Sequence, residues 1–157
     1  MEINNIWGTF SELIPKFNSV RLVFSIPYEV TRSDVRLAVI GSIPELGSWE
    51  TSRCVLATRD PENPGVWRAN ARVSRLTHFE WKWVLLFADR GGVFRWEERI
   101  NRQFTAGIRG GEIIAGWGAD AEYKSGNPYN LSSYFEDDTT MCIFLLILGL
   151  AVYVLLK

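Results

Sequence analysis

The sequence has few of the residues that most enzymes and metal proteins depend on. Its 157 residues include two cysteines and one histidine. Cys54 and Cys142 lie far apart and form no Cys-x-x-Cys or Cys/His spacing, which excludes a zinc motif and argues against a mutual disulfide. No Ser/His/Asp or Cys/His set can be assembled without His78. We predict a non-enzymatic protein with no metal and no cofactor, in a reducing compartment.

A strong charge of either sign is also lacking. Seventeen Lys and Arg balance eighteen Asp and Glu, for a net charge of -1, and no basic stripe is visible. Nothing therefore favours a nucleic acid as partner. The N-terminus has neither a basic segment nor an unbroken apolar run, so we expect no signal peptide.

Aromatic residues, by contrast, are abundant. They make up 13% of the chain and include seven tryptophans. One small core does not need seven indoles, whose N–H groups require partners when they are buried. We therefore expect some of them on the surface for a functional reason.

The chain begins with an amphipathic pattern in residues 1–17. Apolar side chains recur there at helical spacing, with polar residues between them, and Pro15 is expected to end the helix or to follow it. The apolar positions are Ile3, Ile6, Trp7, Phe10, Leu13, Ile14 and Phe17. The simplest role for this helix is docking on its own domain. The alternative is that Phe10-Ser11-Glu12-Leu13, which resembles the short motif of autophagy receptors, binds an Atg8-type protein.

Residues 18–106 have the pattern of an all-β domain. The expected strands are 20–26, 35–40, 67–73 and 79–84, with shorter ones near 54–56, 93–96 and 102–104. About seven short strands separated by Gly, Pro, Asn and Asp turns predict an antiparallel β-sandwich. Residues 107–140 are rich in Gly, Ser, Asn and Asp and are predicted to be a flexible linker.

Residues 141–157 form a hydrophobic tail. Sixteen consecutive apolar residues, 141–156, precede Lys157 and would span about 24 Å as a helix. This run is shorter than a usual transmembrane helix, so a buried core helix is the alternative. Because it has no polar face, we predict a C-terminal transmembrane anchor instead. The sandwich would then face the cytosol, and the scarcity of flanking Lys and Arg favours the endoplasmic reticulum over the mitochondrial outer membrane.

The predicted strand 79–84 separates buried from exposed side chains. Period-two alternation places Phe79, Trp81 and Trp83 on one face, which should be the core, and leaves Lys82 on the other. Trp67 is expected to be in the core for the same reason. Trp49 and Trp96 are expected on the surface instead, because Trp49 lies in a turn-rich loop and Trp96 ends a strand before a charged turn.

These residue types are suited to binding a sugar. The apolar face of a pyranose can lie flat on an indole, which removes apolar area from water at about 25 cal/mol per Å². Hydroxyl groups at the ring edge need donors and acceptors, which Lys82 and Asn101 can supply. Two tilted platforms, Trp49 and Trp96, would fit successive glucose units of a curved α-1,4 chain.

The same residues lie in motifs that resemble the starch-binding domain, carbohydrate-binding module family 20. The resemblance covers roughly residues 20–106 and rests on G-S-x-x-x-L-G-x-W-E ending at Glu50, F-E-x-K in 79–82, and W-E-x-x-x-N-R in 96–102. It implies an immunoglobulin-like sandwich that binds starch, glycogen or cyclodextrins without cleaving them. The binding residues that it implies are Trp49, Lys82, Trp96 and Asn101, with Glu97 contributing through its backbone or side chain.

The resemblance has one departure. Many members of the family have a second site built on tyrosines, and the corresponding segments here, residues 31–34 and 58–63, contain no aromatic residue. We therefore expect one glucan site. A mammalian membrane-anchored member of the family has its anchor at the N-terminus rather than at the C-terminus.

These features predict a non-catalytic protein that binds α-1,4-glucan, as glycogen or starch, and tethers it to an intracellular membrane through residues 141–157. The alternative is a tail-anchored adaptor or targeting subunit whose sandwich binds a protein partner, such as a glucan-modifying enzyme.

Overall fold

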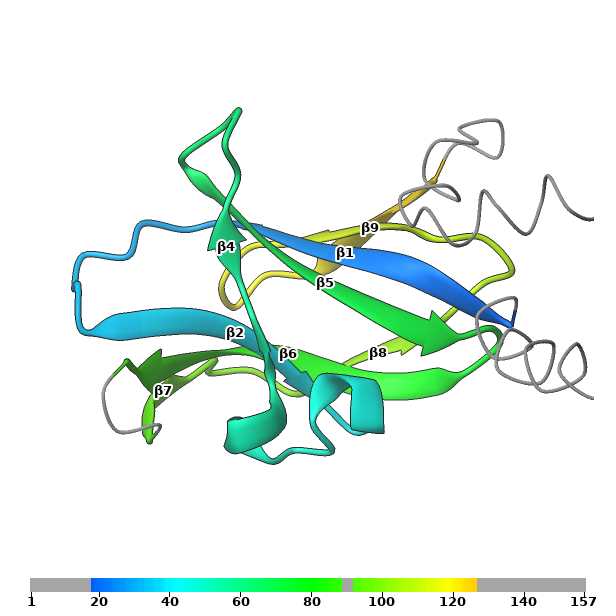
Figure 1. The fold of residues 1–157 in the computed structure, drawn as a ribbon, viewed down its shortest axis with the longest axis horizontal. Helices are drawn as coiled ribbons and strands as arrows, with labels where there is room; N and C mark the ends of the chain where they lie inside the picture. Colours follow the sequence, from blue (N-terminus) through cyan, green and yellow to red (C-terminus); the bar gives the residue numbers. More distant parts are fainter. Residues whose placement is uncertain (1–17, 89–91, 127–157) are drawn as a thin grey trace, which may run out of the picture. The chain divides into compact units, whose positions relative to one another are not determined.

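The described part of the chain, residues 18–88 and 92–126 of a computed structural model, is a two-layer β-sandwich (Figure 1). In sheet A the strand order is β10 (Ala121–Ser125), β9 (Gly111–Ala115), β1 (Ser19–Pro27), β5 (Val66–Ser74) and β4 (Thr58–Arg59). In sheet B the order is β3 (Val55–Leu56), β2 (Val35–Gly41), β6 (His78–Phe87) and β7 (Val93–Trp96), while β8 (Arg102–Thr105) pairs with the first half of β6. Two short 3-10 helices, η1 (Pro44–Leu46) and η2 (Thr51–Arg53), follow β2.

The core lies between the two sheets and follows the predicted alternation. Phe79, Trp81 and Trp83 of β6 are fully buried, which confirms their assignment to the core. Trp67 is only partly buried at the edge of this core, and its indole Nε1 donates to the carbonyl of Tyr28 at 2.9 Å. The strand expectations for sheets A and B are thus confirmed where the period-two pattern was clear.

Part of the outer face of sheet B is buried as well. Four aliphatic side chains of β2 and β6 form a second cluster there: Ala38, Ile40, Val84 and Leu86. Trp49, Cys54 and Val93 pack against this outer cluster, which accounts for the nearly continuous apolar runs of β2 and β6. Burial raises the pKa of the Cys54 thiol, so this cysteine behaves as part of the packing.

The predicted boundary between sandwich and linker at residue 107 is wrong. The described residues form ten strands, and β9 and β10 lie within the segment that was expected to be flexible. Ile113 and Ala115 of β9 are buried in the core. Their strand pairs with β1 in parallel, so the sandwich is not purely antiparallel. Because β9 is short and follows a glycine-rich turn, composition alone did not distinguish it from a linker.

Two predicted elements lie outside the described residues, namely the helix in 1–17 and the apolar run 141–156. Residues 127–140 of the predicted linker lie outside them too. Within 18–88 and 92–126, no helix is long and apolar enough to cross a membrane.

Candidate functional site

Strand register brings two of the predicted site residues to the outer face of sheet B. Lys82 of β6 pairs with Ile40 of β2, and Val84, two residues further along β6, pairs with Trp96 of β7. Residues opposite each other or two apart along a strand share a face. Lys82 and Trp96 therefore border the outer cluster, and the Trp96 side chain is 41% exposed.

Trp49 reaches the same cluster from the loop after β2. Leu46 of η1 is fully buried, and the three residues that follow it all have left-handed backbone conformations, with φ values of 87° at Gly47, 49° at Ser48 and 65° at Trp49. Glycine is required at 47, because a Cβ there would lie 2.8 Å from the backbone of Arg53. This turn, closed by a 2.8 Å hydrogen bond from Trp49 N to the Gly41 carbonyl, lays the indole over the sheet.

The two polar residues of the predicted site are held by protein partners. Lys82 Nζ donates to the carbonyl of Arg99 at 2.8 Å, which leaves two of its three donors for a ligand. Asn101 Nδ2 donates to Glu80 Oε2 at 3.0 Å, and Gln103 Nε2 donates to the other carboxylate oxygen at 3.3 Å. The hydrogen bond from Asn101, then that from Gln103, holds the pKa of Glu80 below its usual value. Glu80 therefore stays ionised and fixes the orientation of Asn101.

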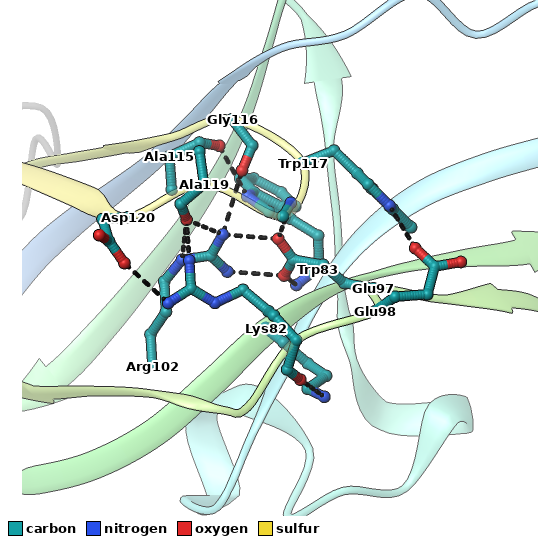
Figure 2. A network of polar contacts seen from close by, with 12 residues as sticks. Lys82, Trp83, Glu97, Glu98, Arg102, Ala115, Gly116, Trp117, Ala119 and Asp120 are labelled. Atoms are coloured by element: carbon teal, nitrogen blue, oxygen red, sulfur yellow. Dashed lines mark hydrogen bonds and ion pairs between the residues drawn. The ribbon is translucent and has the colours of Figure 1, made fainter.

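Glu97 has a different role from the other predicted residues. Its side chain is only 2% exposed and forms a two-pronged ion pair with Arg102, with N–O distances of 2.5 and 2.6 Å (Figure 2). The carboxylate also accepts from the backbone N–H groups of Trp83 at 3.0 Å and Gly118 at 2.7 Å. Burial alone would raise the pKa of Glu97, but these donors outweigh it, and the pKa is lowered. The side chain is not accessible to a ligand, so any ligand contact of Glu97 is left to its backbone.

Arg102 extends the same network to the turn between β9 and β10. Its guanidinium donates to the carbonyls of Gly116 and Ala119 (Figure 2). It also lies 4.8 Å from the ring centroid of Trp81. Arg99 Nη2 donates to Asp120 at 3.0 Å, and a further nitrogen of Arg99 bonds the Ala119 carbonyl. The loop that carries Asn101 is thereby fastened to the β9–β10 turn.

A second connection between these two loops runs through Glu98. Arg95 donates to Glu98 at 2.5 Å. The Trp117 indole N–H donates to the same carboxylate at 3.0 Å (Figure 2). These two hydrogen bonds, that from Arg95 being the stronger, lower the pKa of Glu98 to about 2. The carboxylate is therefore ionised at any physiological pH.

Sequence reasoning missed the residues that position the site rather than form it. Glu80 and Gln103 orient Asn101, and the Arg99 carbonyl holds Lys82. Period-two alternation gives Glu80 the same face as Lys82, and this is the signal in the sequence that could have found it. Nothing local predicts that Glu97 and Arg102, five residues apart across a loop, form a buried pair.

No metal site competes with this assignment in the part of the chain that the structure describes. There, no group of three or more His, Cys, Asp and Glu side chains could hold a metal ion.

The chain is similar in sequence to parts of known proteins. Among curated proteins, the chain is 36% identical over 100 residues to the human starch-binding domain-containing protein 1, covering 63% of this chain and 26% of that protein. It is 34% identical over 94 residues to Glucoamylase-1 of Arthroderma benhamiae, covering 59% of this chain and 14% of that protein. The chain thus spans about a quarter or less of the length of these relatives.

Solved structures share the sandwich at lower identity. The family 20 module of the maltotetraose-forming amylase from Pseudomonas saccharophila superposes with a TM-score of 0.54 at 22% identity, covering 61% of this chain and 98% of that one. A glycoside hydrolase family 15 glucoamylase from Hypocrea jecorina gives 0.57 at 22% identity, covering 65% of this chain and 18% of that one. These likenesses support the fold.

The family model described as the starch binding domain matches residues 19–113, which is more than half of the chain and includes all five predicted site residues. The chain therefore belongs to the starch-binding domain family.

Proposed function

We propose that this protein binds α-1,4-glucan, such as glycogen or starch, on the outer face of sheet B and does not cleave it. The observation that carries the proposal is the placement of two indoles, Trp49 and Trp96, beside one apolar cluster with Lys82 in the adjoining register position. An indole ring offers a flat apolar surface, and Lys82 and Asn101 offer donors and an acceptor at its edge. That combination matches the apolar face and equatorial hydroxyls of glucose.

The site is also prepared before any ligand arrives. Lys82 and Asn101 are already hydrogen-bonded to neighbouring groups, and the loop that carries Asn101 is fastened to the β9–β10 turn. A ligand then does not have to order these side chains, which lowers the entropic cost of binding. This property suits a module that must hold a flexible polysaccharide.

Substitution of either indole tests the proposal. In a chain ending at Gly126, Trp96→Ala or Trp49→Ala should abolish retention on glycogen or β-cyclodextrin beads. Loss of one stacked platform costs about 2 kcal/mol, or roughly 30-fold in Kd. The thermal transition of Trp96→Ala should stay close to that of the parent chain, because this side chain is 41% exposed. Trp49→Ala also removes packing from the outer cluster, so its transition should stay cooperative but move to a lower temperature.

Trp81→Ala is the matched control, since Trp81 is fully buried beneath the same sheet. It should destabilise the fold by about 3–5 kcal/mol. Retention that survives loss of both Trp49 and Trp96 would contradict the assignment and favour a sandwich that binds a protein partner.

We further propose that residues 141–156 anchor this glucan receptor in an intracellular membrane, with the sandwich in the cytosol and the endoplasmic reticulum as the favoured organelle. The support is the unbroken apolar run in the sequence. Many copies confined to one membrane would face a particle with many chain ends, so each bound copy raises the effective concentration for the next.

Alkaline carbonate extraction of the full chain tests the anchor. The full chain should stay with the membrane pellet, whereas a chain ending at Thr140 should be released and still bind isolated glucan. Release of the full chain would refute insertion while leaving the glucan proposal intact.

A further inference from the structure

Two neighbouring connections at one end of the sandwich each present an exposed aliphatic residue beside an arginine. The β5–β6 turn carries Arg75 and Leu76, and the β8–β9 loop carries Ile108 and Arg109. The exposed fractions are 71% for Leu76 and 64% for Ile108. Leu76 N donates to the carbonyl of Ala106 at 2.8 Å, so the two connections lie side by side. We call Arg75, Leu76, Ile108 and Arg109 the end patch.

The backbone conformation and exposure of Leu76 indicate that this leucine does not stabilise the fold. Its φ is 61°, in the left-handed region that costs a non-glycine residue stability and that Gly, Asn or Asp would occupy more readily. Its side chain is also largely in water, so it contributes little to the core. A residue that is unfavourable in both respects and yet present suggests a role on the surface.

Positive charge surrounds the end patch. Arg72 near the end of β5 and Lys124 near the end of β10 are exposed, and both strands finish at this end of the sandwich. None of Arg72, Arg75, Arg109 and Lys124 is paired with a carboxylate of the described residues. Arg75 Nε is buried without a hydrogen-bond partner among them. Arg72, Arg109 and Lys124 are exposed and therefore available to an anionic partner, whereas Arg75 is partly buried beside them.

The first strand begins and the last strand ends at this same end of the domain. β1 begins here, since Ser19 pairs with Ser74 at the end of β5, and β10 ends here, since Ser125 pairs with Gly111 at the start of β9 (Figure 1). The segment that continues from Gly126 contains the apolar run 141–156. The end patch thus lies at the end of the sandwich where β1 begins and β10 ends.

We propose that the end patch rests on the surface of a lipid bilayer that contains anionic phospholipids. Leu76 and Ile108 would enter the boundary between headgroups and acyl chains, while the exposed Arg72, Arg109 and Lys124 face the lipid phosphates. Each basic residue near such a surface contributes roughly a fivefold factor in partitioning. The contact requires neither glucan nor an inserted tail, and it leaves the outer face of sheet B free to bind glucan.

Hydrogen exchange of the full chain tests the contact. The protein is mixed with phosphatidylcholine vesicles that either lack or contain phosphatidylserine. Amides of residues 107–110 should exchange about tenfold more slowly with the anionic vesicles, and high salt should remove the difference. Amides in the loop that carries Asn101 should not change.

Leu76→Asn separates a surface role from a structural one. Asparagine accepts the left-handed backbone, so the thermal midpoint should stay the same or rise, while most of the slowing is lost. Leu56→Asn, at a leucine that is 47% exposed on β3, is the matched control and should keep the slowing. Arg109→Gln should reduce the preference for anionic vesicles by roughly fivefold.

Equal exchange with both kinds of vesicle would overturn the proposal, as would full slowing in the double variant Leu76→Asn/Ile108→Asn. Binding of the full chain to phosphatidylserine vesicles but not to phosphatidylcholine vesicles would contradict the inserted tail and support the end patch. The proposal of an inserted tail and the proposal of the end patch can therefore be refuted independently.

Discussion

A chain ending at Ala106 should lose its cooperative unfolding transition, whereas a chain ending at Gly126 should keep it. The shorter chain lacks the buried side chains of Ile113 and Ala115 and the backbone pairing of β9 with β1. A large-to-small change at a single buried aliphatic residue costs about 2–5 kcal/mol, and a whole strand removes several such contributions. That total is comparable with the entire stability of a domain, about 5–15 kcal/mol.

The truncation also strips partners from buried polar groups. The Trp83 indole loses the Ala115 carbonyl, and Glu97 loses the Gly118 N–H. Each buried polar group left without a partner adds about 1–3 kcal/mol. Near-ultraviolet circular dichroism during heating measures the difference between the two chains. A cooperative transition in the shorter chain, within a few degrees of the longer one, would show that β9 and β10 are dispensable.

Removal of one partner of the buried ion pair should have the largest effect of any single substitution at the site. Arg102→Met leaves the Glu97 carboxylate buried without its cation, and loss of one partner of such a pair costs about 3–5 kcal/mol. The double variant Glu97→Gln/Arg102→Met should recover part of that loss, because no buried charge remains. Chemical denaturation of the three chains measures the effect, and equal losses in the single and double variants would contradict it.

The pH dependence of stability follows from the same pair. The pKa of Glu97 is lower in the folded protein than its ordinary value of about 4.5, so its carboxylate stabilises the fold above that value. This contribution should disappear as the pH falls through the lowered pKa. The stability difference between the parent chain and Arg102→Met should therefore shrink in acid. A difference that grows in acid would mean that Glu97 is not the ionised partner.

Period-two alternation predicted the strands of the inter-sheet core well, because burial of one face of a strand leaves a direct mark in the sequence. Phe79, Trp81 and Trp83 are the clearest case, and Lys82 was correctly placed on the other face. Alternation gives Val84 the same face as Lys82, yet Val84 is buried there in the cluster against which Trp49 packs. A side chain that returns from a distant loop to cover a sheet leaves no periodic signal.

The end of the domain was harder to predict, since β9 and β10 are five residues each and lie among glycines. What makes β9 a strand is its pairing with β1 and the burial of Ile113, which are contacts over long sequence separations, and β10 then pairs with β9. The role of Glu97 escaped prediction for the same reason. Its partners at Arg102, Trp83 and Gly118 come from three different parts of the chain.

The fastening of the Asn101 loop to the β9–β10 turn limits how the two loops can vary in length. Gly116, Gly118 and Ala119 each contact Glu97 or Arg102 through a backbone atom, so the number of residues between them matters more than their identity. Deleting one residue would move the next backbone group by about 3.8 Å, more than the length of a hydrogen bond. Homologous sequences should therefore tolerate substitution of Gly116 and Ala119 more readily than of Gly118, whose φ is 74°. Insertion or deletion should be rare unless the loop that carries Asn101 changes length as well.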